Sequence, residues 1–70
     1  MISEIELERG RPLAITVQTE GGPERILLDR GRDYGFDLGH LEEHRNQKLP
    51  VLVEVEEADG RTVAVKIEDA

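Results

Sequence analysis

The sequence has no cysteine and no tryptophan, and it has only one tyrosine and one phenylalanine. Without cysteine, neither a disulfide framework nor a cysteine-based metal site can support the fold. No apolar run approaches the roughly 18 residues that a membrane-spanning helix needs. The acidic, alternating start (residues 1–8) is neither a signal peptide nor a transit peptide. These absences predict a cytoplasmic protein without membrane association.

The length of 70 residues predicts one domain, residues 1–70, near the lower limit for a chain that folds without disulfides or metals. Hydrophobic residues make up 37% of the chain and aromatic residues 3%, so the core must be thin and aliphatic. Such a core suits a small β-barrel.

The net charge of −7 argues against a protein held on nucleic acid by bulk electrostatics. Residues 9–32 are the exception, with five Arg against three acidic residues. This basic island is either a solvated surface or a binding surface, and the sequence leaves both open.

Four segments alternate apolar and polar residues with the period of two that is typical of strands: 2–8, 12–19, 51–57 and 62–69. A fifth and shorter strand is predicted at 25–29. Matching the apolar faces of neighbouring strands predicts three-residue loops at 9–11 and 58–60, and a loop within 20–23 that Pro23 lengthens. The resulting pairs are Leu7 with Leu13, Ile5 with Ile15, Val17 with Ile26, Ile15 with Leu28, Val55 with Val63, Val53 with Val65, and Val51 with Ile67.

One short helix is predicted between the third and fourth strands. Asp37 is a suitable N-cap, residues 38–48 can form the helix, and Pro50 ends any helix before the next strand. The predicted order is therefore three strands, one helix and two strands.

The fold class predicted from this order is mainly β: a five-stranded antiparallel OB-like small barrel with one short helix between strands 3 and 4. A sheet of this size has exposed edges unless it closes, and the element order is that of the OB barrel. An SH3-like barrel or another open β-roll is the alternative.

The segment KLPVLVEVEEADGRTVAVKIEDA (48–70) resembles the closing hairpin of the S1-like OB-fold domains of RNA-binding and translation proteins. The resemblance implies an OB fold that binds RNA. The family usually carries aromatic residues on its second and third strands. This chain has other residues at the corresponding outward positions: Ala14, Thr16, Gln18, Arg25 and Leu27.

OB domains meet their ligands on strands 2 and 3 and on the loops after strands 1 and 4. In this chain those places predict a nucleic-acid-binding set of Arg9, Arg11, Gln18, Arg25 and Arg61. Arginine forks bind phosphate or carboxylate. We therefore expect a small non-enzymatic module that binds single-stranded RNA weakly. The alternative is an acidic protein-interaction or regulatory module of unknown partner, with Leu27 and Leu52 available for dimerisation. The oligomeric state stays open.

The stretch RGRDYGFDLGHLEEHR (30–45) contains an H-x-x-E-H motif at His40 and His44. A catalytic zinc needs a third ligand and a walled cleft, which a short helix on a small barrel does not predict. We therefore interpret both histidines as surface residues and expect no metal and no cofactor, although a divalent-metal site there stays open. No nucleophile stands beside a base, so no enzyme is predicted.

The two aromatic residues of that stretch allow two interpretations. Arg30 and Arg32 with Tyr34 and Phe36 could form a stacking site for single strands. The sequence favours the other interpretation, in which the aromatic rings plug one end of the barrel and the two Arg extend the basic edge.

Overall fold

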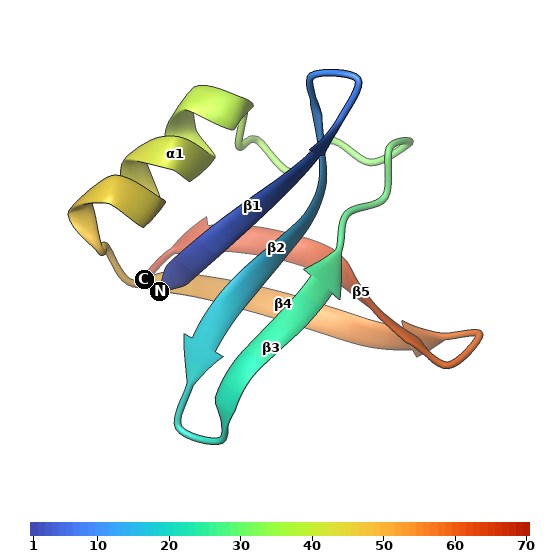
Figure 1. The fold of residues 1–70 in the computed structure, drawn as a ribbon. Coiled ribbons are helices and arrows are strands. Elements are labelled where there is room, and N and C mark those ends of the chain that lie inside the picture. The colour runs from blue at the N-terminus through green and yellow to red at the C-terminus, as the bar shows by residue number, and fades with distance from the viewer.

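The computed structural model describes all residues, 1–70, and contains five strands and one helix (Figure 1). The elements in chain order are β1 (Ile2–Glu8), β2 (Arg11–Thr19), β3 (Gly22–Leu27), α1 (Leu38–Gln47), β4 (Val51–Ala58) and β5 (Arg61–Asp69). This element order confirms the predicted one. The helix has neither the length nor the hydropathy of a membrane span.

The five strands form one mixed sheet in the order β1-β2-β3-β5-β4. Three of the four pairings are antiparallel, but β3 and β5 run parallel and meet at a single pair, Leu27 with Val63. The prediction of a fully antiparallel sheet is therefore wrong. No ladder joins the outer strands β1 and β4, so the sheet does not close into the barrel that the edge-strand argument predicts.

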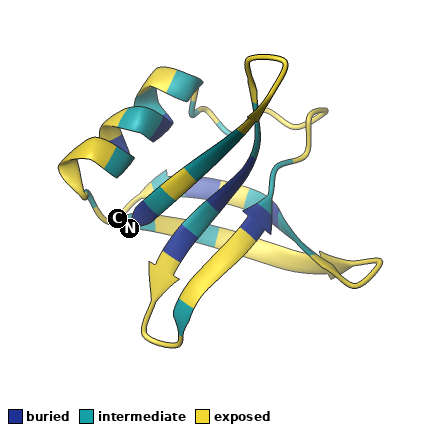
Figure 2. Cartoon of the chain, in the orientation of Figure 1, coloured by how far each residue is buried: buried dark blue, intermediate teal, exposed yellow.

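The apolar core lies between the curved sheet and α1. Figure 2 shows buried positions along the strands and on the side of α1 that faces them. The core cluster consists of Ile2, Ile15, Val17, Ile26, Leu41, Ala64 and Ile67. Every member is aliphatic, as the composition predicts, and the two aromatic side chains pack only against its edge.

Two of the hairpin loops are one residue shorter than predicted. Arg9-Gly10 and Asp59-Gly60 are two-residue loops in which all four residues have positive φ, between 52° and 78°. This conformation defines the type I′ turn, whose twist matches that of the flanking strands. The predicted three-residue loops are therefore wrong.

The strands restore the apolar faces by β-bulges instead. In the β1–β2 ladder the register shifts between Glu6 and Leu7, which leaves Leu13 without a partner. In the β4–β5 ladder it shifts between Glu54 and Val55, which leaves Val65 without one. A β-bulge inserts one extra residue into one strand. The residues of that strand beyond the bulge therefore change sides of the sheet relative to an unbroken ladder. Of the pairs predicted for these two hairpins, Ile5 with Ile15 is confirmed and the other four are wrong. The observed pairs are instead Leu7 with Pro12, Val55 with Ala64, Val53 with Ile67 and Val51 with Asp69.

The β2–β3 hairpin is shifted by two residues from the predicted register. Ile15 pairs with Ile26, but Val17 lies opposite the exposed Glu24. The two pairs predicted for this hairpin are therefore wrong, and its loop is shorter than predicted. Pro23 lies inside β3 opposite Gln18, next to the pair that flanks the loop. Antiparallel pairs alternate between hydrogen-bonded and non-hydrogen-bonded, so this position tolerates a residue without an N–H.

The boundaries of α1 follow local sequence chemistry. Asp37 caps the helix as predicted, since its side chain accepts a hydrogen bond of 2.8 Å from the His40 backbone N–H. The helix ends at Gln47, and Lys48 takes the left-handed C-cap conformation at φ 53°. Only Leu41 and His44 of the helix are buried, so two side chains dock it.

Gly60 provides a test of the type I′ turn. Its φ is +73° and a Cβ there would touch nothing, so Gly60→Ala should act only through backbone strain. We expect a loss of roughly 1–2 kcal/mol in the free energy of unfolding, measured with urea. Gly39→Ala is the matched control. Gly39 lies in α1, where alanine should instead raise stability by about 0.5–1 kcal/mol. If both substitutions changed the free energy of unfolding in the same direction, the turn assignment would be contradicted.

Candidate functional site

The five residues predicted to bind nucleic acid are only partly brought together. Arg25 and Arg61 line a shallow hollow on the sheet, together with Leu13, Leu27, Gly60 and Thr62. Arg11 lines a different hollow. Gln18 lies near the other end of β2, where its side-chain amide donates to the Ser3 hydroxyl at 3.2 Å. Arg9 lies in the exposed β1–β2 turn.

Arg25 is engaged by a carboxylate of the same sheet. Its guanidinium donates two hydrogen bonds to Glu6, at 2.6 and 3.0 Å. These hydrogen bonds, followed by the charge attraction, raise the pKa of Arg25 and lower the pKa of Glu6. A phosphate or carboxylate ligand at this hollow must therefore compete with Glu6 for the guanidinium.

The hollow beside Arg11 has a volume of about 200 Å³ and is lined by three arginines. Arg11 comes from the start of β2, and Arg30 and Arg32 come from the segment between β3 and α1. Its apolar lining includes Leu41 and Ile67 of the core. Arg30 pairs with Glu8, and Arg32 donates to the Val65 carbonyl at 3.3 Å. Of the three guanidinium groups, that of Arg11 has no hydrogen bond or ion pair.

Tyr34 and Phe36 lie between this hollow and the core. The Tyr34 hydroxyl accepts a hydrogen bond from the Asp29 N–H at 2.9 Å and donates one to the Ala64 carbonyl at 2.7 Å. Both rings are half-buried and pack against the core cluster. The rings therefore pack on the edge of the core, but they plug no barrel end, because the sheet does not close. Both residues also line the hollow.

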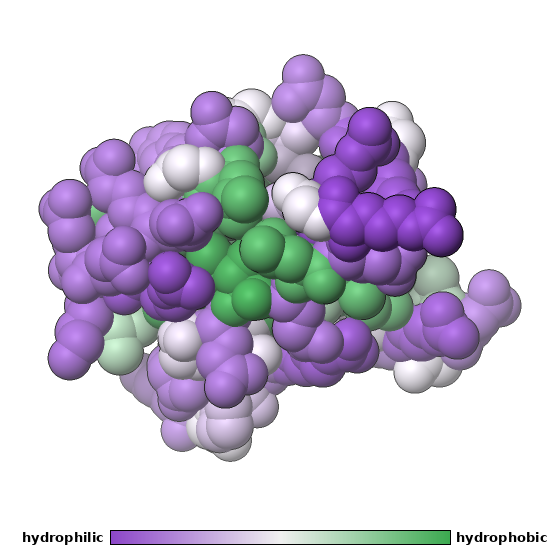
Figure 3. All heavy atoms as spheres, turned by 45° about the horizontal axis from the view of Figure 1, so that its top comes forward, coloured by the Kyte–Doolittle hydropathy of each residue, from purple (hydrophilic) through white to green (hydrophobic).

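The two hollows lie at the same end of the β2–β3 pair. Pro12 and Leu28 line one hollow, and their chain neighbours Leu13 and Leu27 line the other. Seen from above this end, the surface shows an apolar strip flanked by hydrophilic side chains (Figure 3). The sequence had indicated Arg30 and Arg32 as an extension of the basic edge, but no sequence signal places them beside Arg11.

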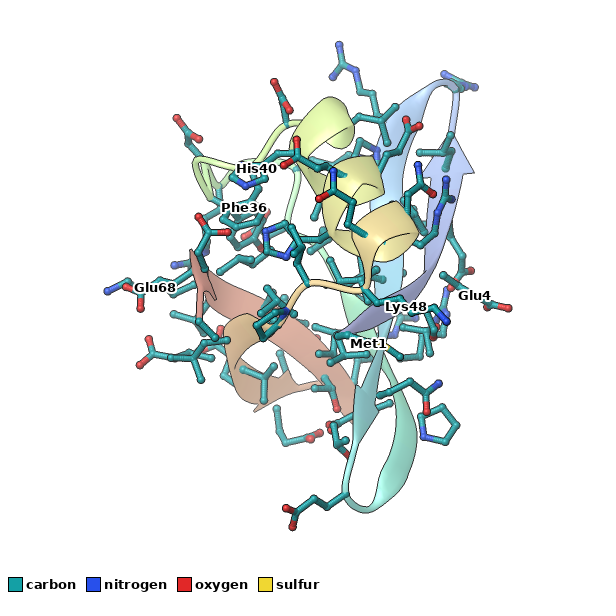
Figure 4. The ribbon with its side chains drawn as sticks, turned by 90° about the vertical axis from the view of Figure 1, so that its left-hand side faces the viewer. Met1, Glu4, Phe36, His40, Lys48 and Glu68 are labelled. Carbon is teal, nitrogen blue, oxygen red and sulfur yellow. The ribbon has the colours of Figure 1, made fainter.

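A separate polar cluster joins α1 to the end of β5. The Nε2 atom of His44 lies 2.5 Å from Oδ1 of Asp69, and Nε2 of His40 lies 3.4 Å from the same oxygen. His44 is only 2% exposed, so its interpretation as a surface residue is wrong. Phe36 stacks on His40, with ring centroids 4.0 Å apart. Figure 4 shows the two residues side by side.

His40, His44 and Asp69 are the residues of this chain that could hold a metal ion, because their ligand atoms all lie within 4.8 Å of one another. Sequence reasoning singled out the two histidines by their spacing but missed Asp69, which lies 25 residues beyond His44. The two arginine-lined hollows and this cluster are thus the candidate sites. Comparisons with protein-family models, with curated proteins and with solved structures found no match to this chain.

Proposed function

We propose that this chain is a small non-enzymatic module of OB-like architecture that binds single-stranded RNA weakly and with little sequence preference. The observation that carries the proposal is the arginine surface, the six basic residues at or near the two hollows: Arg9, Arg11, Arg25, Arg30, Arg32 and Arg61. They are six of the nine basic residues of an acidic chain.

The architecture supports this proposal at the level of element order. Three strands, a helix and two strands in a five-stranded mixed sheet that does not close are compatible with the partly open OB barrel. In that fold the β2–β3 region and the neighbouring loops bind oligonucleotides. The arginine surface occupies this region.

The chemistry of the surface predicts weak binding. Guanidinium forks suit phosphates, and base stacking would contribute about 1–3 kcal/mol per base. However, Tyr34 and Phe36 are half-buried, and Phe36 already stacks on His40. Arg25 and Arg30 must also be released from Glu6 and Glu8. We therefore expect charge to dominate recognition and stacking to contribute little.

An amide chemical-shift titration with a mixed-sequence single-stranded RNA tests the proposal. We expect saturable shifts at the arginine surface that weaken with salt. If about three phosphates are neutralised, the slope of log K against log salt should be roughly −2. Shifts at Gln18 would extend the interface along the whole of β2. Absence of shifts at millimolar RNA would overturn the proposal.

Paired substitutions give the titration a control. Arg11→Gln combined with Arg32→Gln should weaken RNA binding by at least about fivefold, because two phosphate-binding charges are lost. Arg45→Gln, on α1 and away from both hollows, should leave it within about twofold. If Arg45→Gln instead lowers log affinity by about half as much as the double substitution, only the overall charge matters.

One observation favours a second function, the binding of a protein. On the outer strand β4, Leu52 is 54% and Val55 43% exposed. An unpaired strand edge with exposed apolar residues is a site for self-association or for a partner strand. Leu27 does not belong to this surface, since it is half-buried in the Arg25 hollow. Sedimentation without RNA tests the self-association form of this function, because pairing of two chains through β4 would yield a dimer. The cytoplasmic location stays a prediction.

A further inference from the structure

The cluster at the end of β5 brings three metal-binding atoms together from two elements. His40 and His44 are one helical turn apart, so both imidazole rings leave the same side of α1. Asp69 approaches them from β5, with Oδ1 at 3.4 Å from Nε2 of His40 and 2.5 Å from Nε2 of His44. Two nitrogens and one oxygen thus converge on one point.

The surrounding residues fix this arrangement in advance. Phe36 lies flat against His40, with an angle of 6° between the rings. Asp37 caps α1 through the backbone N–H of His40 itself. The ring of His44 is buried beside Leu41, the residue that docks the helix in the core. Binding would therefore cost little ordering of the two histidines.

We propose that His40, His44 and Asp69 form a Zn²⁺ site. Zinc takes imidazole nitrogen at about 2.0–2.1 Å and carboxylate oxygen at about 2.0–2.2 Å in tetrahedral geometry, which separates neighbouring ligand atoms by about 3.3 Å. The 3.4 Å between His40 and Asp69 already fits. The His44–Asp69 pair must open by less than 1 Å once no proton bridges it. Asp69 is exposed, so water can fill the fourth position.

The second ring nitrogen of His44 limits the affinity of the proposed site. In this structure Nε2 of His44 faces Asp69, and Nδ1 of His44 is buried without a hydrogen-bond partner. A neutral imidazole that binds zinc through Nε2 carries its proton on Nδ1, and here that proton would have no acceptor. Loss of such a supporting acceptor typically lowers metal affinity by 10–100-fold. We therefore expect micromolar rather than nanomolar affinity.

The proposed ion would link α1 to the end of β5, because its ligands come from both elements. Because the three ligands converge only in the folded chain, zinc at 100 times its dissociation constant should raise the folding equilibrium constant about a hundredfold. Magnesium and calcium prefer oxygen ligands, so neither should stabilise the protein.

The test is calorimetric titration of the full chain with zinc chloride in a buffer that does not bind metal, with magnesium chloride in parallel. We expect one zinc per chain and no magnesium binding. His40→Gln and Asp69→Asn should each lower zinc affinity at least tenfold. Glu43→Gln and Glu68→Gln remove neighbouring carboxylates outside the cluster and should leave it unchanged.

Three outcomes would overturn the proposal: no saturable zinc binding below about 1 mM, an equal loss in the Glu43 or Glu68 variants, or unchanged affinity in the His40 and Asp69 variants. His40 and Asp69 are exposed enough for their variants to fold, and amide spectra check this directly. None of these results depends on RNA binding, so the two proposals stand or fall separately.

Discussion

Ile15→Ala should lower the free energy of unfolding by about 2–5 kcal/mol, the usual cost of truncating a fully buried Ile. Ile15 is 0% exposed and occupies the middle of β2, paired with Ile5 on one side and Ile26 on the other. A 70-residue domain has roughly 4–10 kcal/mol of total stability. This single change should therefore remove about half of it, and in the least stable case unfold the chain.

Leu7→Ala is the matched control for that variant. Leu7 is also an aliphatic residue of the β1–β2 hairpin, but it is 51% exposed. Its truncation should cost no more than about 0.5 kcal/mol. Urea unfolding of both variants measures the difference. If the two losses agree within 1 kcal/mol, the core does not centre on β2.

The strands could be predicted because one face of each is apolar and the other charged. This period-two pattern and the Asp37 and Pro50 signals located every element to within about three residues at each end. They depend only on local chemistry: side chains alternate along a strand, and a carboxylate caps the helix. No knowledge of distant contacts was needed.

The loops were predicted wrongly because face matching assumes an unbroken ladder. The Asp59-Gly60 sequence is itself a strong type I′ signal, yet it would set Glu56 against Val63, which appeared to mix the faces. In the structure Glu56 does pair with Val63. A β-bulge between Glu54 and Val55 then shifts the register, so that Val53 pairs with Ile67. Bulges have little sequence signature, so turn chemistry was the better guide here.

Contacts between segments that lie far apart in the chain could not be predicted from the sequence. The parallel contact of β3 with β5 depends on one residue pair, Leu27 with Val63. The burial of His44 depends on how α1 lies against the sheet and on Asp69 at the end of β5. Neither contact leaves a periodic pattern in the sequence, because each joins segments that lie far apart along the chain.

Docking of α1 depends on Leu41 more than on any other side chain. The helix buries only His44 and Leu41, and Leu41 is 1% exposed and part of the core cluster. A ten-residue helix is marginal in water by itself. Leu41→Ala should therefore cost about 2–5 kcal/mol and weaken the helix more than the sheet.

Hydrogen exchange of the Leu41→Ala protein distinguishes local from global loss. Because α1 packs mainly against β1 and donates no hydrogen bond to the strands through its backbone, its amides should exchange faster than those of the β2–β3 ladder. Uniform acceleration in both elements would instead show that helix and sheet open together. If the zinc proposal holds, zinc should restore protection of α1 in Leu41→Ala. It should not do so when Asp69→Asn is added, because then the ion has lost its ligand on β5.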